Sequence, residues 1–297
     1  MKRTIAIVAG GDSSELVVSL RSAQGLYSFI DKERYNLYIV EMEGHRWEVV
    51  LPDGSKTPID RNDFSFMENG EKKQFDFAYF TIHGTPGENG ILQGYFDLLG
   101  IPYSSCNVLV SAMTFNKFTC NQYLKGFGIR VAESLILRKG CEITDEEVIN
   151  KIGLPCFIKP NAGGSSFGVT KVKTKEDIQP AIEKAFEESD EVMIEAIMKG
   201  TEITCGCYKT SDKEVVFPIT EVVSANEFFD SGAKYNGESP EITPARLPED
   251  TAARVSMLNS ALYDIMGSSG ILHMAHNINH DENRHSLEIH NTTGHTA

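Results

Sequence analysis

A lysine followed by a glycine- and serine-rich loop lies near the middle of the chain. Residues 157–159 are Phe-Ile-Lys, and residues 160–169 then read Pro-Asn-Ala-Gly-Gly-Ser-Ser-Phe-Gly-Val. Glycines permit backbone conformations that bring main-chain N–H groups close to an anion, while Ser165 and Ser166 add hydroxyls and Lys159 a positive charge. This order favours a hairpin that binds the phosphates of a nucleotide. An ordinary glycine-rich turn is the alternative that the loop alone leaves open.

Carboxylates and a second lysine follow at positions where a nucleotide could be bound. Glu195 and Glu202 lie on either side of a predicted strand end, and such groups could accept hydrogen bonds from the amine of a purine and the hydroxyls of a ribose. Acidic residues around a glycine turn are usually just solvated, so the pair by itself is a weak signal. Residues 228–235 combine aromatic side chains with Lys234 and Tyr235 in a predicted loop, and loops of this kind often act as lids.

Two further loops near the N-terminus also follow predicted strands. Thr4–Ala9 is predicted as a buried strand, and residues 10–15, Gly-Gly-Asp-Ser-Ser-Glu, separate it from a helix predicted from Ser19. Ligands of open α/β sheets bind beyond the carboxyl ends of the strands, so Glu15 is placed to face a substrate. The alternative is that Glu15 only favours the helix N-terminus electrostatically. The loop at 83–90, His-Gly-Thr-Pro-Gly-Glu-Asn-Gly, follows another strand and indicates a binding site.

The elements that must position these residues alternate between strands and helices, which predicts an α/β protein. Besides those above, strands are predicted at 35–41, 75–81, 129–137 and 191–198, and helices at 91–99, 111–123, 144–151 and 174–188. Lys117 falls inside the second of these helices. The positions of the motifs predict three parts, comprising residues 1–104, 105–190 and 191–297.

Composition restricts the class of protein. A chain of 297 residues is expected to form two or three domains, and its formal charge of −14 argues against a nucleic-acid or anionic-membrane partner. No apolar run is long enough for a membrane span or a signal peptide. The six cysteines show no Cys-x-x-Cys pairing and are predicted to be free thiols in a reducing cytoplasm, with Cys205 and Cys207 buried on one face of a strand.

Taken together and in order, these motifs resemble the D-alanine:D-alanine ligases of the ATP-grasp superfamily. The resemblance runs over nearly the whole chain and is carried by Gly10-Gly11 with Glu15 and Val18-Ser19-Leu20, His83-Gly84 with Gly87–Gly90 and Gln93-Gly94, Ile101-Pro102-Tyr103, Lys117, Lys159-Pro160 with Gly164-Ser165-Ser166, and Lys234-Tyr235. It implies an N-terminal open, Rossmann-like α/β domain followed by a two-subdomain ATP-grasp fold. ATP would lie between the last two parts.

The resemblance also implies roles for individual residues. Lys117, Lys159, Ser165 and Ser166 would bind ATP phosphates, Glu195 and the backbone near Ile197 the adenine, and Glu202 the ribose. Ser165, Glu15 and Tyr235 would close the lid and orient the first D-alanine, with His83 beside its carboxyl group and Lys234 beside the transferred phosphate. The family further implies two Mg²⁺ ions, with Mn²⁺ as a substitute, and a homodimer. The Lys-Tyr pair predicts D-alanine rather than D-lactate as second substrate.

The C-terminal segment departs from the family pattern. The family has Arg-x-Asp on one strand and Glu-x-Asn on a later one, which supply an oxyanion donor and metal ligands. Here His273 replaces the arginine, Ala275 removes a carboxylate, and His290 takes the asparagine position, so Glu288 and His290 are the expected metal ligands. The family's last segment, which contacts the second substrate, is expected to be missing beyond Ala297. Six of the eight histidines lie between His273 and His295, and a soft-metal cluster is an alternative to an altered magnesium site.

Two functions are therefore carried forward. The first is the ATP-dependent joining of two D-alanines to D-alanyl-D-alanine through an acylphosphate, for peptidoglycan precursors, with His273 standing at the oxyanion position. The second is a catalytically impaired nucleotide-binding protein of the same fold. Residues 273–290 are the feature that separates the two.

Overall fold

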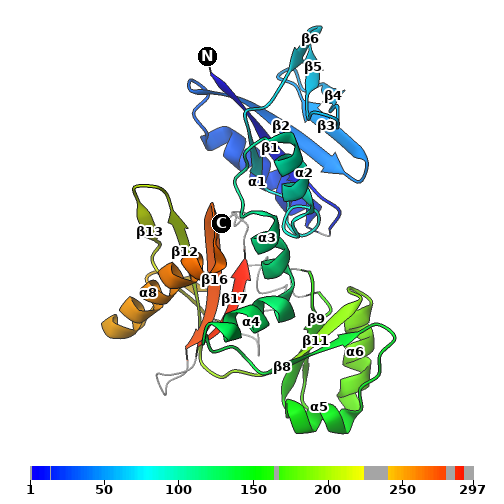
Figure 1. Ribbon diagram of the computed structural model, residues 1–297, viewed down its shortest axis with the longest axis vertical. Coiled ribbons are helices and arrows are strands. Elements are labelled where there is room, and N and C mark those ends of the chain that lie inside the picture. The colour runs from blue at the N-terminus through cyan, green and yellow to red at the C-terminus, as the bar shows by residue number, and fades with distance from the viewer. Residues whose placement is uncertain (1, 14, 164–166, 224–239, 279–284, 291–297) are drawn as a thin grey trace. The chain divides into compact units, whose positions relative to one another are not determined.

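The computed structural model describes residues 2–13, 15–163, 167–223, 240–278 and 285–290, the last six by their backbone alone. Helices and strands are mixed along the chain, with runs of strands over residues 35–80 and 191–222 (Figure 1). Chain contacts divide it into two compact units, Met1–Ala112 with Gly267–Leu272, and Met113–Met266 with His273–His290. In the described part of the chain, no helix is both long and apolar enough to span a bilayer.

The first unit is built on one mixed sheet. Its strand order is β4-β3-β2-β1-β7, with β1 parallel to β2 and β7, and the other two pairs antiparallel. The bounds are β1 (Arg3–Gly10), β2 (Tyr35–Glu43), β3 (Arg46–Val50), β4 (Lys56–Pro58) and β7 (Phe77–Phe80). A separate hairpin of β5 (Phe66–Glu68) and β6 (Glu71–Lys73) and two helices, α1 (Leu16–Phe29) and α2 (Ile91–Leu99), complete the unit.

Strand β1 is buried on both faces, as its continuous apolar sequence predicts. Val8 belongs to the same apolar cluster as Phe96 of α2, whereas its neighbour Ile7 belongs to a second cluster with Ala23 of α1. Because successive side chains point to opposite faces of a strand, the two helices cover opposite faces of the sheet. The predictions of a buried strand at 4–9 and of a helix at 91–99 are therefore confirmed.

The second unit begins within the helix at Val108–Phe115 and continues with another short helix and a four-stranded antiparallel sheet of order β10-β9-β11-β8. The bounds are α3 (Val108–Phe115), α4 (Lys117–Gly126), β8 (Ser134–Arg138), α5 (Asp145–Lys151), β9 (Cys156–Pro160), β10 (Thr170–Val172), the 3₁₀ turn η1 (Lys175–Asp177), α6 (Ile178–Phe186) and β11 (Glu191–Ala196). Ile158 and Ile194 from the strands pack in one cluster with Ile182 of α6 and Val148 of α5. The helices therefore cover one face of this sheet (Figure 1).

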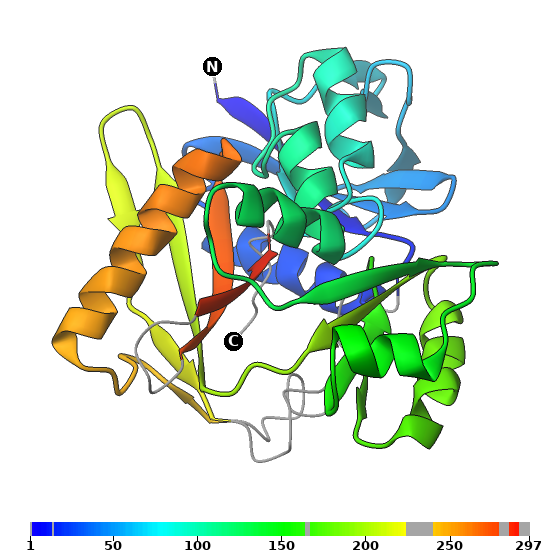
Figure 2. The same cartoon turned by 60° about the horizontal axis from the view of Figure 1, so that its bottom comes forward.

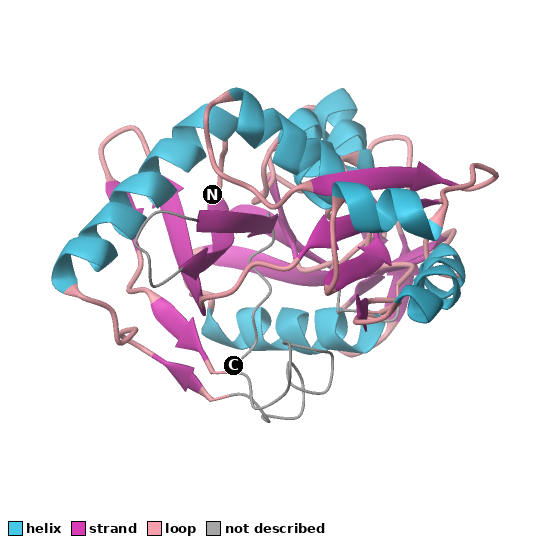
Figure 3. Ribbon diagram, turned by 90° about the horizontal axis from the view of Figure 1, so that it is seen from below, coloured by secondary structure: helices cyan, strands magenta, loops and turns pink. Residues whose placement is uncertain are grey.

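A larger sheet of order β15-β14-β12-β16-β17 follows, with β13 paired to β12. The bounds are β12 (Thr201–Lys209), β13 (Glu214–Val216), β14 (Thr220–Val222), β15 (Glu241–Ile242), α8 (Glu249–Met266), β16 (Ile271–Ile278) and β17 (His285–His290). Helix α8 packs against β12 and is the long orange helix of Figure 2 and the long cyan helix at the left of Figure 3. Val255 of α8 packs in one apolar cluster with Cys205.

The cysteines have the environment that the sequence predicts. All six are free thiols, and Cys205 and Cys207 are both buried at alternate positions of β12. Burial raises the pKa of the Cys205 thiol to about 12 and that of Cys156 to about 11. These two thiols are therefore protonated at neutral pH.

Several predicted elements differ from the structure. The helix expected from Ser19 already starts at Leu16. The helix expected at 111–123 is broken at Asn116, which is extended and caps α4 with its side chain. The strand expected at 129–137 starts only at Ser134, because its partner β11 ends at Ala196. The helix expected from Thr174 begins with a 3₁₀ turn, because the threonine hydroxyl donates to the Asp177 carboxylate at 2.7 Å instead of capping the backbone.

Candidate active site

Lys159 and Glu195 form an ion pair on the face of the four-stranded sheet opposite its apolar core. Met193 is the partner of Lys159 across the β9–β11 ladder, so Glu195 lies diagonally from the lysine on the same face. Lys159 Nζ is 2.7 Å from Glu195 Oε2, and the two side chains are 10% and 14% exposed. Glu195 Oε1 also accepts a hydrogen bond from Asn121 Nδ2 at 3.2 Å. The carboxylate thus holds the lysine ammonium in place in a largely desolvated site.

Lys117 is the first residue of α4 and reaches the glycine loop. Its Nζ donates to the carbonyl oxygen of Gly163 at 2.7 Å, and its backbone N–H donates to the carbonyl oxygen of Asn161 at 3.1 Å. The first-turn N–H groups of α4 already donate to Asn161 and Asn116, so the cationic group at this helix start is the Lys117 ammonium. The structure therefore brings Lys117 and the loop after Lys159 together, as expected for phosphate recognition.

The glycine loop depends on backbone conformations that other residues adopt only with strain. Gly168 has φ +69°, and a Cβ there would lie 2.9 Å from Cγ of Pro160. The chain thus turns back immediately over the end of β9, which lets β10 pair with it. Ser165 and Ser166 lie outside the described residues, as do Lys234 and Tyr235 of the predicted lid.

The residues predicted to contact the nucleoside lie on the connection from β11 to β12. Ile197 follows β11 directly, and Glu202 is the second residue of β12, where it pairs with Val222 of β14. Both side chains are half-buried. The structure thus places Glu195, Ile197 and Glu202 along one short stretch, with Glu195 paired with Lys159.

In the first unit, Ser13 connects the loop at 10–15 to the loop at 83–90. Its hydroxyl donates to the carbonyl oxygen of His83 at 2.9 Å and accepts from the backbone N–H of Glu15 at 3.2 Å. Glu15 occupies the N-cap position of α1 and is buried, but its side chain makes no capping hydrogen bond. His83 is also buried, and its Nε2 has no hydrogen-bond partner among the described residues. A polar ligand would supply one.

The C-terminal hairpin places the altered positions opposite each other. In the β16–β17 ladder, His273 pairs with His290 and Ala275 pairs with Glu288. His273 and Ala275 lie on the same face of β16, and this face is less buried than the face that carries Leu272. The positions at which the family has its oxyanion donor and metal ligands therefore share one region of the hairpin.

The donors in this hairpin do not fit two magnesium ions. Mg²⁺ and similar hard cations require several oxygen ligands, and imidazole suits softer metals. Residues 271–278 and 285–290 contain one carboxylate, Glu288. Among the described residues, no three His, Cys, Asp or Glu side chains gather as a metal site. The soft-metal alternative also falls largely on histidines whose side chains are not described.

An ion pair fixes the base of the β14–β15 strand pair. Glu221 is buried on β14, and its Oε2 accepts from the backbone N–H of Arg246 at 3.1 Å and from Nε at 2.9 Å, while Oε1 accepts from Nη2. These charge-assisted bonds hold the pKa of the Glu221 carboxyl below its usual range. The carboxylate therefore stays ionised at neutral pH although it is buried.

Sequence reasoning missed several polar residues that hold the site together. Asn121 contacts Glu195, and Asn161 contacts the first turn of α4. The signal for Asn116 was its capping type directly before Lys117, since asparagine is a preferred N-cap. Asn121 and Asn161 carry no comparable signal, because their partners are remote in sequence.

Comparisons with known proteins agree with this arrangement. The chain matches the family models "D-ala D-ala ligase N-terminus" over residues 4–106 and "D-ala D-ala ligase C-terminus" over residues 123–297. A curated D-alanine–D-alanine ligase from Phocaeicola vulgatus is 90% identical over 297 residues, which is 100% of this chain and 92% of the relative.

Solved structures of this family are also similar. D-alanyl-alanine synthetase A from Vibrio cholerae has a TM-score of 0.85 at 27% identity, covering 98% of this chain and 89% of that one. The VanG D-Ala:D-Ser ligase from Enterococcus faecalis has a TM-score of 0.84 at 27% identity, covering 98% and 90%. The fold, the lysine sites and these similarities lead to one conclusion: the chain belongs to the D-alanine–D-alanine ligase family, with its α/β, ATP-grasp fold.

Proposed function

We propose that the protein joins two molecules of D-alanine at the expense of ATP and so makes a precursor of peptidoglycan. The observation that carries the proposal is the pair of lysines at the glycine hairpin, with Lys159 held by Glu195 at 2.7 Å and Lys117 held on the loop at 2.7 Å. Membership of the ligase family supports the reaction type.

The residues would share the work as follows. Lys117 and Lys159 neutralise the phosphates, the carboxylate of Glu195 and the backbone at Ile197 receive the adenine, and Glu202 receives the ribose. In the first unit, Glu15 and His83 orient the first D-alanine, and the unpartnered Nε2 of His83 supports this role. Ser165, Ser166, Lys234 and Tyr235 would complete the phosphate site and its lid.

The reaction proceeds in two steps. A carboxylate is a poor electrophile, so an oxygen of the first D-alanine attacks the γ-phosphorus, the bond to ADP breaks, and an acylphosphate forms. The amine of the second D-alanine then attacks the carbonyl carbon, loses a proton, and displaces inorganic phosphate. Phosphoryl transfer depends mainly on positioning and charge neutralisation, which these lysines and backbone N–H groups supply.

Metal binding in this chain would differ from that of the family. Glu288 fits as ligand of one magnesium ion held chiefly by the nucleotide phosphates, and His290 is a poor second ligand for a hard cation. The second ion of the family lacks its carboxylate at Ala275. We therefore assign one ion at most to this hairpin and derive no step through it.

Other features of the family extend to the chain as proposals. We infer a homodimer in the cytoplasm, with D-alanine and ATP as ligands and without a nucleic-acid or membrane partner. D-alanine is proposed over D-lactate as second substrate. The parts 1–104, 105–190 and 191–297 are proposed as the substrate-binding domain and the two ATP-grasp subdomains.

The test is release of phosphate by the purified protein with ATP and D-alanine, with the dipeptide identified by mass. Lys117→Ala should abolish most of this activity. The matched control is Lys125→Ala on the same helix, because Lys125 is exposed and its ammonium forms a surface ion pair with Glu133 at 2.8 Å. D-alanine-independent phosphate release, or equal loss in both variants, would contradict the proposal.

One observation favours a second function. His273 and Ala275 stand at the positions where the family has arginine and aspartate, so an imidazole and a methyl group replace a permanent cation and a carboxylate. This second function is nucleotide binding without turnover. ATP binding by calorimetry combined with no phosphate release over hours would establish it in place of the first.

A further inference from the structure

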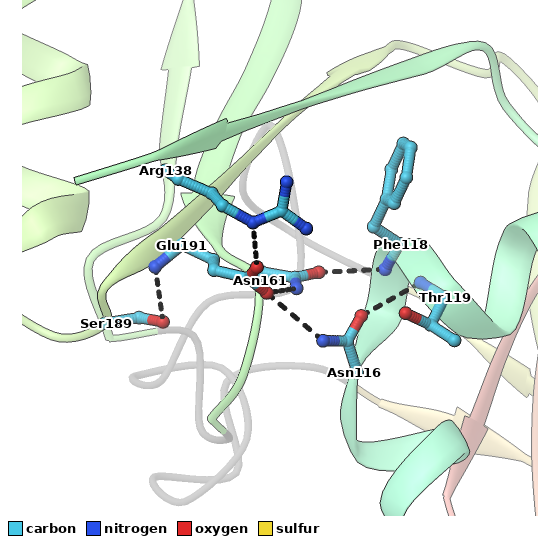
Figure 4. A network of polar contacts seen from close by, with 7 residues as sticks. All are labelled: Asn116, Phe118, Thr119, Arg138, Asn161, Ser189 and Glu191. Atoms are coloured by element: carbon cyan, nitrogen blue, oxygen red, sulfur yellow. Dashed lines mark hydrogen bonds and ion pairs between the residues drawn. The ribbon is translucent and has the colours of Figure 1, made fainter. Parts of the chain in front are cut away.

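A set of polar contacts centred on Glu191 joins four elements of the second unit, β8, β9, β11 and α4 (Figure 4). Glu191 is the first residue of β11, and its Oε2 accepts hydrogen bonds from Nδ2 of Asn161 at 2.7 Å and from Nδ2 of Asn116 at 3.2 Å. On its other side, Oε1 accepts from Nε of Arg138 at 2.9 Å. One charged acceptor thus binds amide groups from the end of β9 and the start of α4.

Asn161 uses every polar group that it has. It follows β9 directly and is 1% exposed. Its backbone N–H donates to the carbonyl of Glu191 at 2.9 Å, and its carbonyl accepts from the N–H of Lys117 at 3.1 Å. Its side-chain Oδ1 accepts from the N–H of Phe118 at 2.8 Å, while Nδ2 donates to Glu191. The first turn of α4 is therefore bound to the ends of two strands through one residue.

Asn116 makes the same connection from the helix side. Its Oδ1 caps α4 by accepting from the N–H of Thr119 at 2.9 Å, and its Nδ2 donates to Glu191. Its backbone also forms a bridge with Ala162. The residue that starts α4 is thus tied to both strands, and the helix cannot shift along its axis without breaking these bonds.

Both phosphate-binding lysines adjoin this set of contacts. Lys117 follows Asn116, and Lys159 precedes Asn161 by two residues in β9. We propose that Glu191 and Asn161 are positioning residues that fix the start of α4 against β9 and β11, and so set the spacing of Lys117 and Lys159 for the nucleotide. The inference rests on the proposed function, since it assigns these lysines to ATP.

The polar contacts of Glu191 and Asn161 lie apart from the apolar core that stabilises the sheet. The apolar core of the sheet, with Ile158 and Ile194, lies on the face covered by α5 and α6, and neither Asn161 nor Glu191 belongs to that cluster. Loss of these polar bonds leaves the core packing unchanged. A misplacement of about 1 Å in a positioning group can cost ~10²-fold in rate.

The decisive variant is Asn161→Asp. It keeps the shape of the side chain and the oxygen that accepts from Phe118, but it places an anionic oxygen where Nδ2 now lies, 2.7 Å from Glu191 Oε2. Two carboxylates at that separation repel each other, so the start of α4 must move. We expect kcat/KM for ATP to fall ~10- to 100-fold and the Kd for ATP to rise, with KM for D-alanine within about twofold of wild type.

Reversal of the hydrogen-bond polarity provides the rescue. In the double variant Asn161→Asp with Glu191→Gln, the new amide at position 191 donates to the new carboxylate at position 161, and the repulsion between the two carboxylates disappears. The rescue is partial, because Nδ2 of Asn116 loses the oxygen to which it now donates. We expect kcat/KM for ATP to recover at least ~fivefold relative to Asn161→Asp alone. The matched control is Lys139→Ala, which removes an exposed ion pair with Asp190 on the same strand pair and should leave all parameters unchanged.

Hydrogen exchange of residues 117–119 gives a readout apart from activity, and it should quicken in Asn161→Asp and slow again in the double variant. Unchanged kcat/KM for ATP in Asn161→Asp, or no recovery in the double variant, overturns the inference. An equal loss of kcat/KM for ATP and for D-alanine together with a lowered Tm also overturns it, because that pattern indicates general destabilisation. Wild-type protein that binds ATP but releases no phosphate defeats the proposed function alone, and the inference is then judged on the ATP Kd. Wild-type protein that binds no ATP overturns both.

Discussion

Replacement of Lys159 by methionine should reduce stability and ATP affinity by separable amounts. The ion pair with Glu195 joins atoms 2.7 Å apart in side chains that are 10% and 14% exposed. Methionine keeps most of the apolar volume of the lysine stem but removes the charge. Glu195 is then left with Asn121, whose 3.2 Å hydrogen bond does not neutralise a carboxylate.

The magnitude follows from the burial. Removal of one partner of a fully buried ion pair costs about 3–5 kcal/mol, because the remaining charge is uncompensated. The exposed fraction reduces this to about 2–4 kcal/mol of unfolding free energy. At ~2–4 °C per kcal/mol for a domain of this size, Tm should fall by roughly 4–16 °C. Loss of a charged hydrogen bond to phosphate, ~1.5–3 kcal/mol, should raise the ATP Kd about 10- to 100-fold.

The double variant Lys159→Met with Glu195→Gln separates the two effects. It removes the orphaned charge and keeps an acceptor for Asn121, so most of the lost Tm should return while ATP binding stays weak. Differential scanning fluorimetry without nucleotide and calorimetry with ATP are the assays. A double variant as unstable as Lys159→Met would show that the loss comes from packing, and wild-type ATP affinity in either variant would refute the phosphate role.

Three other outcomes are expected. His273→Arg should raise phosphate release, by up to ~10²–10³ if a permanent cation restores an oxyanion donor. Arg246→Met should lower the free energy of unfolding measured in urea. Because Arg246 lowers the pKa of Glu221 in the folded protein, the stability difference from wild type should be complete above about pH 4.3, the ordinary pKa of a glutamate. It should shrink as the pH falls through the lowered pKa of Glu221 in the folded state. A thiol reagent should label Cys141 rapidly in the native protein, since it is exposed, and buried thiols such as Cys205 only after unfolding.

Each of these has a clear contrary result. Equal rates in wild type and His273→Arg would mean that His273 does not occupy the oxyanion position. A stability difference for Arg246→Met that persists unchanged to pH 2 would mean that the Glu221 carboxylate is not its origin. Rapid labelling of more than one thiol in the native protein would contradict the burial of the remaining cysteines.

The sequence alone determined the elements whose pattern is local. The apolar run at 4–9 predicted a buried strand, and the helix at 91–99 has the bounds that its pattern predicts. Alternation placed Cys205 and Cys207 on one buried face of β12. Ordered motifs, from Gly10-Gly11 to Lys159-Pro160, indicated the family because each needs a particular residue type at a fixed place in the fold.

Only the tertiary structure decided how the site is held together. The capping type of Asn116 was the one local signal for the break in the helix, because the contacts that hold it come from Asn161 and Glu191 elsewhere in the chain. The ion pair of Lys159 with Glu195 depends on the register of β9 with β11, and the pairing of Ala275 with Glu288 on that of β16 with β17. Residue type and local periodicity fix what a side chain can do, whereas register and packing between distant segments decide which partner it meets.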